Sequence, residues 1–207
     1  MSEKAVLISI RPNWVEKIES GEKTIEVRKS RPKVETPFKV YIYMTMGGVP
    51  KVIHTKDFKA KSIYEVQPNT ANGRVIGEFV CDRIDCFFAR YDDHGIADLE
   101  PSRLIYGLGN ANQENEYLYK CCLTHDELFN YIISSQGGYG YGWHISDLKI
   151  YDKPKELKEF TPICRVRKDL CEICCFHEEE FGGCCRSLTR PPQSWCYVEP
   201  LKENADD

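Results

Sequence analysis

Hydrophobic positions along the first thirty residues switch from one period to another. Residues 4–10, KAVLISI, form a nearly continuous apolar run of the length of a buried strand. Residues 12–20 then place Trp14 and Ile18 four positions apart, which is the spacing of one helix face. Gly21 follows at a position suited to a left-handed helix end. The pattern therefore predicts a strand and then a short helix.

Residues 24–28, TIEVR, alternate as a strand does. The two apolar side chains fall on one face, while Glu26 and Arg28 fall on the other together with Thr24. Lys23 precedes them at the junction of helix and strand, so the stretch forms a compact polar constellation. One interpretation is a functional site. The alternative is a solvated edge strand with a surface ion pair that contributes little stability.

The rest of the chain is expected to alternate between strands and helices, with one long insertion. In chain order we expect a strand at 38–43, an irregular insertion at 44–72, a strand-rich stretch at 73–90, a short helix at 98–106, a helix at 124–135 and a strand at 139–148. Thr124 and Glu127 have the spacing of a capping box, which marks the start of the last helix.

The stretch YGYGWHIS at 139–146 alternates glycines with aromatic residues. Glycine lets backbone or a ligand approach closely, and Tyr141 and Trp143 offer stacking faces. His144 and Ser146 follow within reach of such a site. The alternative is that Trp143 is a core side chain and that His144 lies on the surface or is hydrogen-bonded.

Composition is that of an ordinary globular protein: 207 residues, 42% apolar and 29% charged. No apolar run could cross a bilayer and the first residues lack a signal-peptide pattern, so we expect no membrane contact and a cytoplasmic location. The net charge is −4, but residues 1–61 hold 13 Lys and Arg against 7 Asp and Glu, which leaves 15 against 25 for the remainder. A basic region could face phosphates, although ordinary patchiness gives the same count.

A family resemblance adds to this picture. The pattern Gly21-x-Lys23-x-x-Glu26-x-Arg28, preceded by a helix and a tryptophan, resembles the signature of the ASCH domain family, a branch of the PUA-like β-barrels. Residues 72–79, 143–146 and 151–157 resemble later strands and the closing turn of bacterial and prophage members. The resemblance implies an α+β fold over residues 1–160: a PUA-like mixed β-barrel of about five or six strands with flanking helices.

The same resemblance implies binding of RNA or of a modified nucleobase or nucleoside in a basic cleft. Lys23 and Arg28 would contact phosphate or base oxygens, and Glu26 would accept from an exocyclic amine or orient Arg28. Bases would stack on aromatic side chains. The full set of expected ligand-binding residues is Trp14, Lys23, Glu26, Arg28, Tyr141, Trp143, His144 and Ser146.

A hydrolase is the alternative that the resemblance leaves open, with Lys23 and Glu26 as the candidate catalytic residues. ASCH members include amidohydrolases of N4-acetylcytidine, in which a threonine nucleophile lies three residues after the lysine. Here Glu26 occupies that place and Thr24 lies one residue after the lysine, a departure that speaks against deacetylation. Other members are ribonucleases, for which the conceivable residues are Lys23, Tyr43, His144 and Ser146, and Glu78 is a further candidate acid or base.

Residues 161–207 are expected to form a cysteine-rich tail around zinc. Seven of the eleven cysteines lie between Cys164 and Cys196, and such clustering in a chain without a secretion signal favours metal binding over disulfides. Four thiolates would close a structural tetrahedral site. The preferred ligands are Cys171, Cys174, Cys185 and Cys196, with Cys175 and Cys184 as alternates and Cys164 as a further possibility. A third hypothesis makes this zinc-stapled tail a docking module for a protein partner.

The tail generates the first testable prediction. Metal analysis of the purified protein should find zinc, and a chelator should remove it, because the tail is too short to bury a core without a cross-link. Protein that contains no zinc before chelation would contradict the prediction.

Overall fold

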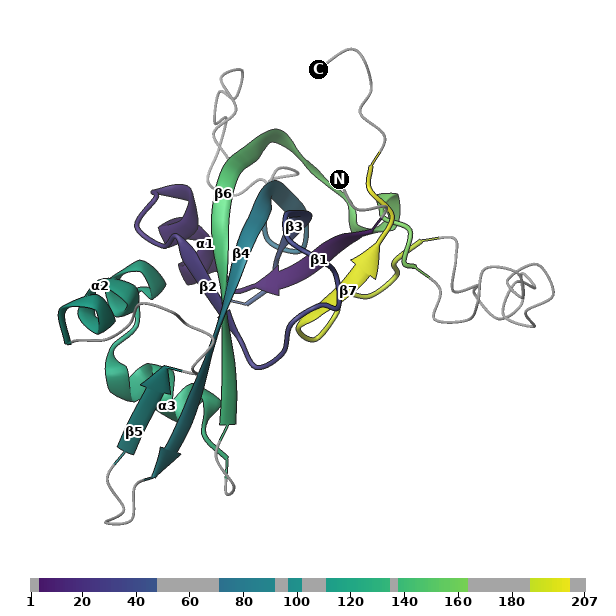
Figure 1. Cartoon of the computed structure of the whole chain (residues 1–207). Coiled ribbons are helices and arrows are strands. Elements are labelled where there is room, and N and C mark those ends of the chain that lie inside the picture. Colours follow the sequence, from purple (N-terminus) through teal and green to yellow (C-terminus); the bar gives the residue numbers. More distant parts are fainter. Residues whose placement is uncertain are drawn as a thin grey trace. The chain divides into compact units, whose positions relative to one another are not determined.

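The computed structural model describes residues 4–47, 71–91, 97–101, 111–134, 138–163 and 187–201. In chain order its elements are β1 (Ala5–Ile10), α1 (Pro12–Glu19), β2 (Ile25–Arg28), β3 (Phe38–Met44), β4 (Val75–Tyr91), β5 (Ala97–Pro101), α2 (Ala111–Cys121), α3 (His125–Ile132), β6 (Gly138–Lys155), a 3-10 turn (Leu157–Glu159) and β7 (Trp195–Val198) (Figure 1). The strands are paired in the order β2-β6-β4-β3-β1-β7, and β5 pairs with β4. Because β1 and β3 are parallel while β1 and β7 are antiparallel, the sheet is mixed, and the expected α+β class is confirmed.

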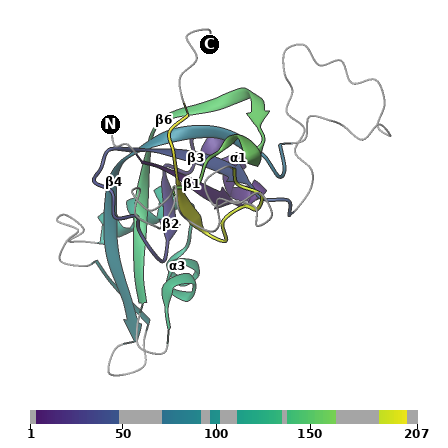
Figure 2. The same cartoon turned by 90° about the vertical axis from the view of Figure 1, so that its right-hand side faces the viewer.

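The chain divides into two compact units. Unit 1 comprises Met1–Val15, Phe38–Phe79 and Lys149–Asp207, and unit 2 comprises Glu16–Pro37 and Val80–Leu148. The long strands β4 and β6, which are prominent in both views (Figure 1 and Figure 2), contribute residues to each unit.

Unit 1 is built around β1, whose six residues are all buried, as its apolar run predicts. β1 lies between β3 and β7, and the Ser9 hydroxyl, its one polar side chain, donates to the Pro192 carbonyl oxygen at 2.6 Å. One buried apolar cluster of unit 1 consists of Ala5, Leu7, Tyr41, Tyr43, Val75, Phe160 and Val198. The described end of the expected tail is therefore a strand of this sheet, while the boundary at residue 160 stays a prediction.

Unit 2 packs helices against one face of its strands. The core cluster between its strands and helices is made by β2, β4, α2 and α3 and contains Ile25, Val27, Phe87, Ala89, Tyr117, Leu118, Cys121, Leu128, Phe129 and Ile132. The capping box of α3 is confirmed, since the Thr124 backbone N–H donates to the Glu127 carboxylate at 2.8 Å and the Glu127 N–H donates to the Thr124 hydroxyl at 3.2 Å. The helix before residue 21 is confirmed as well, and Gly21 has a φ of 78°.

Two details of the fold differ from expectation. Residues 97–101 form strand β5, paired antiparallel with β4, where the sequence had suggested a helix at 98–106. Pairing along the end of the long strand β4 overrides the local pattern there. In the described part of the chain, six strands follow one another in the pairing order, as expected, and β5 pairs with β4 beside them; no described pairing joins β2 to β7 to close a barrel. Within the described residues, no helix has the length and apolar character needed to cross a bilayer.

The glycines of β6 make room for aromatic side chains of the unit 2 core. A Cβ on Gly142 would collide with the Tyr117 hydroxyl, and a Cβ on Gly140 would collide with the Phe87 ring. Tyr117 is 8% exposed, and its hydroxyl has no hydrogen-bond partner among the described residues. Its burial raises the pKa of this phenol, which keeps it protonated.

Replacement of Tyr117 by phenylalanine should therefore stabilise the protein. Removal of a buried polar group that lacks a partner is expected to raise the free energy of unfolding by about 1 kcal/mol. Urea denaturation measures the change, with Tyr119→Phe on the exposed side of α2 as the control. A loss of stability would mean that the hydroxyl is satisfied, against the prediction.

Candidate functional site

Lys23, Glu26 and Arg28 form a buried ion array in unit 2. The Lys23 ammonium lies 3.5 Å from one oxygen of the Glu26 carboxylate, and the Arg28 guanidinium lies 2.9 Å from the other. The three residues are 3%, 6% and 9% exposed. The alternative of a solvated edge strand is therefore wrong, and the array is a desolvated, geometrically fixed group.

Backbone contacts on both sides hold Lys23 at this position. Its N–H donates to the Lys17 carbonyl oxygen at the end of α1, and the next N–H, of Thr24, donates to the Lys120 carbonyl oxygen in α2. The Lys23 ammonium also donates to the Cys121 carbonyl oxygen at 2.7 Å. A cation at the C-terminus of a helix satisfies the carbonyl groups that the helix leaves without partners. Lys23 thus links the helix end to the glutamate.

Pairing with β6 determines what lies beside the array. Glu26 is opposite Trp143 and Arg28 is opposite Tyr141, and directly opposed residues of an antiparallel pair share a face. Trp143 is fully buried, as the core-side-chain alternative held. Tyr141 is half-buried, and the guanidinium of Arg31 lies 5.9 Å from its ring centroid. Of the two expected stacking residues on β6, only Tyr141 is accessible.

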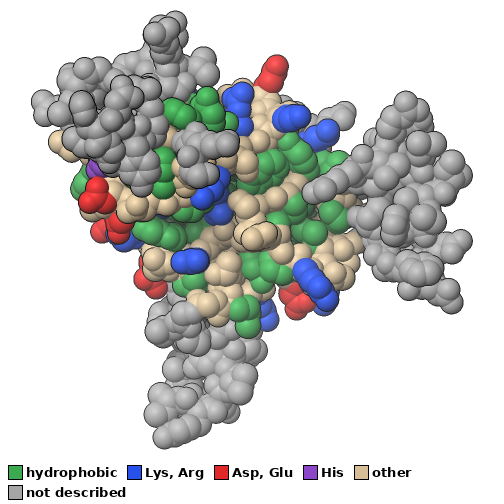
Figure 3. Space-filling view, turned by 90° about the horizontal axis from the view of Figure 1, so that it is seen from below, with side chains coloured by type: hydrophobic (Ala, Val, Ile, Leu, Met, Phe, Trp, Pro, Cys, Tyr) green, Lys and Arg blue, Asp and Glu red, His purple; other side chains and the backbone are tan. Residues whose placement is uncertain are grey.

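On the face of the molecule drawn in Figure 3, Lys and Arg side chains are dispersed among hydrophobic ones. Charge alone therefore does not single out a binding site on this face.

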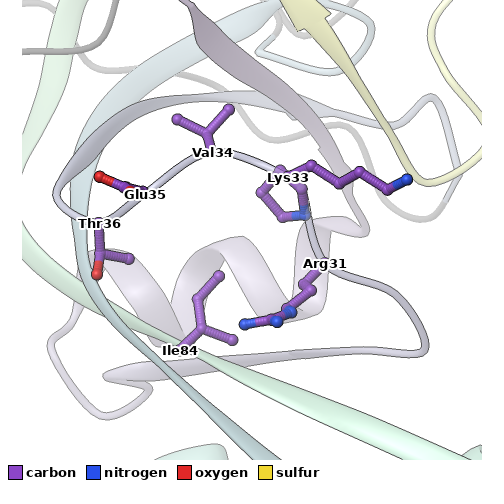
Figure 4. A pocket seen from close by; sticks show the side chains of 7 residues that line it. Arg31, Lys33, Val34, Glu35, Thr36 and Ile84 are labelled. Carbon is purple, nitrogen blue, oxygen red and sulfur yellow. The ribbon is translucent and has the colours of Figure 1, made fainter.

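A pocket of about 460 Å³ lies beside Arg31 in unit 2. It is formed by the loop from Arg31 to Thr36, with Ile84 of β4 completing the wall. In the close-up, Arg31 and Ile84 lie on the same side of the opening, and the Lys33 side chain extends away from it (Figure 4). The Arg31 guanidinium and the Thr36 hydroxyl can bind an anionic group of a ligand, and Ile84 can contact an apolar ring of the same ligand. The sequence pattern singled out no residue of this loop, because a pocket made by one loop and a distant strand leaves no periodic signal.

His144 and Ser146 lie on the opposite face of β6, because side chains alternate along a strand. The His144 Nε2 lies 2.6 Å from the Asp85 carboxylate and 2.9 Å from the Arg83 guanidinium. The Ser146 hydroxyl donates to the Val80 carbonyl oxygen at 2.9 Å. The strand therefore separates these two expected ligand residues from Arg28 and Tyr141, despite their closeness in sequence.

Three further candidates belong to unit 1. Trp14 is half-buried in α1 and Tyr43 is 5% exposed in β3. Glu78 accepts a hydrogen bond from the Tyr151 hydroxyl at 2.6 Å and pairs with the Lys39 ammonium at 3.2 Å. With its carboxylate engaged in this way, Glu78 serves as a structural anion of unit 1.

The expected zinc ligands Cys171, Cys174 and Cys185 lie outside the described residues, as do the alternates Cys164, Cys175 and Cys184. Cys196 is half-buried on β7, against the core of unit 1. In the part of the chain that the structure describes, no three His, Cys, Asp or Glu side chains come together as a metal site. The zinc site stays a prediction.

Comparison with known proteins gives a weak likeness. No protein-family model matches the sequence, and no curated protein matches it. The crystal structure of ASCH from Zymomonas mobilis has a TM-score of 0.45 and 16% sequence identity, covering 96% of this chain and 90% of that one. A mutant form of the same protein gives 0.45, 17%, 95% and 89%.

The buried array predicts a large effect of removing its anion. Glu26→Gln should lower the free energy of unfolding by roughly 3–5 kcal/mol, because it leaves two buried cations without their shared partner. Chemical denaturation measures the change, and Glu22→Gln, on an exposed residue four positions earlier, is the matched control. A change below about 1 kcal/mol, the value of a surface pair, would contradict the burial.

Proposed function

We propose that this protein binds a nucleotide, either free or as part of RNA, at the pocket beside Arg31. The observation that supports this most directly is that Arg31 makes two contacts at once. Its side chain lines the pocket, and its guanidinium lies over the ring of Tyr141. A planar cation suits phosphate oxygens, and an accessible tyrosine ring suits a base.

The charge of the surrounding loop supports an anionic ligand. Residues 29–35, KSRPKVE, hold three cations and one carboxylate, and all four of these side chains are exposed. A net positive loop attracts phosphate, and Pro32 limits the conformations of its backbone. The loop is therefore a basic rim beside the pocket.

The ion array has a supporting part in this proposal. Arg28 lies opposite Tyr141 on the same strand face and is held by the Glu26 carboxylate. Lys23, only 3% exposed, holds Glu26 and the end of α2, so it is a positioning residue here rather than a phosphate ligand. We accordingly assign the phosphate contact to Arg31, with Arg28 fixing the strand behind it.

The hydrolase alternative remains a hypothesis without a favouring observation. Glu26 occupies the place of the threonine nucleophile, and both of its oxygens are engaged in ion pairs. Thr24, the nearest hydroxyl in the motif, is exposed. Incubation with N4-acetylcytidine tests the alternative directly, and release of cytidine would support it over binding alone.

Substitution of Arg31 tests the proposal. Arg31→Gln should weaken binding of uridine 5′-monophosphate and of a labelled RNA hexamer about 10- to 140-fold, the range for loss of a charged hydrogen bond. It should also reduce the slope of log affinity against log salt for the hexamer by about one. Fluorescence anisotropy and competition titrations give both quantities.

Lys153→Gln is the matched control, since it removes one exposed cation from unit 1 and should leave affinity almost unchanged. The hexamer should remain intact throughout the titration. Equal losses in the two variants would mean that only overall charge matters, and an unbound wild-type protein would overturn the proposed function altogether.

A further inference from the structure

Tyr139 and Phe88 form an aromatic pair that is not part of the pocket lining. Tyr139 is two residues before Tyr141 on the same strand. Tyr139 is the second residue of β6 and is 56% exposed. Its ring centroid lies 4.8 Å from that of Phe88 on β4, with the two planes inclined by 46°. Phe88 is itself only half-buried. A tyrosine that keeps this much of its surface in water, supported from the side by a phenylalanine, presents an aromatic platform.

Alternation along β6 places this platform on the same face as the proposed site. Tyr139 and Tyr141 are two residues apart, so both point to the face that also bears Arg28. Their Cα atoms are separated by about 7 Å, since a strand rises about 3.3 Å per residue. The bases of single-stranded RNA can be unstacked and splayed apart, so neighbouring bases can each reach a separate tyrosine.

The platform stands on a rigid base. Gly140, between the two tyrosines, lacks a side chain where the Phe87 ring fills the opposite face of the strand. Phe87 is 4% exposed and belongs to the core of unit 2. The helix-covered core thus fixes the strand whose other face bears the tyrosines, and little ordering is required on binding.

We propose that Tyr139 and Phe88 form a second base-stacking subsite, so that the ligand is single-stranded RNA of at least two nucleotides lying along β6. This inference rests on the proposed function, in which Arg31 and Tyr141 hold the first nucleotide. The neighbouring cations favour a polyanion over an uncharged partner. Stacking accepts any base, so the subsite adds affinity with length and little sequence preference.

Affinity as a function of RNA length tests the inference. Wild-type protein should bind triuridylate more tightly than uridine 5′-monophosphate. Tyr139→Ala should weaken binding of the trinucleotide roughly 5- to 140-fold, the range for loss of one stacked base. Binding of the mononucleotide should not change. Tyr139→Phe should keep the full effect of length, because stacking uses the ring and not the hydroxyl.

Tyr119→Ala is the matched control, since Tyr119 is 76% exposed on α2 and should leave both affinities unchanged. Thermal unfolding of Tyr139→Ala should match the wild type because the side chain is exposed. If the mononucleotide binds and length adds nothing, or if Tyr139→Ala leaves trinucleotide binding intact, the second subsite is wrong while the proposed function stands. If no mononucleotide and no RNA binds, the proposed function fails, and this inference with it.

Discussion

The alternation of side chains across the β2–β6 pair is the constraint on which the site depends. One face of the pair carries Ile25, opposite His144, and Val27, opposite the small Gly142, and accepts the helices of unit 2. The other face carries Glu26 and Arg28, opposite two aromatic residues of β6. A shift of one residue in register would exchange the two sets and place charges under the helices. The same pairing therefore determines both the core and the candidate site.

Burial of three charges in so small a volume is costly, and the geometry explains how the fold tolerates it. Each Glu26 oxygen faces a different cation, and Lys23 has a carbonyl oxygen as a further partner. Desolvation of ions is offset only where their remaining hydrogen-bonding positions are filled. The main effect of the array is therefore to specify how β2 and the end of α2 are arranged, and its net contribution to stability is small.

The sequence predicts local elements and the shared face of the motif, but not what covers that face. Strand β1, helix α1, the cap of α3 and the alternation of β2 all follow from period and capping chemistry. Strand β5 does not, because its partner is a distant strand rather than its own sequence. The convergence of Lys23, Glu26 and Arg28 was expected, whereas the pocket at Arg31 required the position of Ile84, 53 residues further on. Sequence proximity also misled for His144, since neighbours along a strand point to opposite faces.

The glycine–aromatic alternation of β6 links folding to recognition. Glycine was expected to let a ligand approach, but Gly140 and Gly142 instead admit Phe87 and Tyr117 from the core. The aromatic residues of the alternation, Tyr139, Tyr141 and Trp143, point to the other face of the strand. A side chain at either glycine would have to displace a core ring, and the strand that bears the tyrosines would move with it. The position of the proposed stacking platform thus depends on packing against the opposite face of β6, where Phe87 and Tyr117 lie.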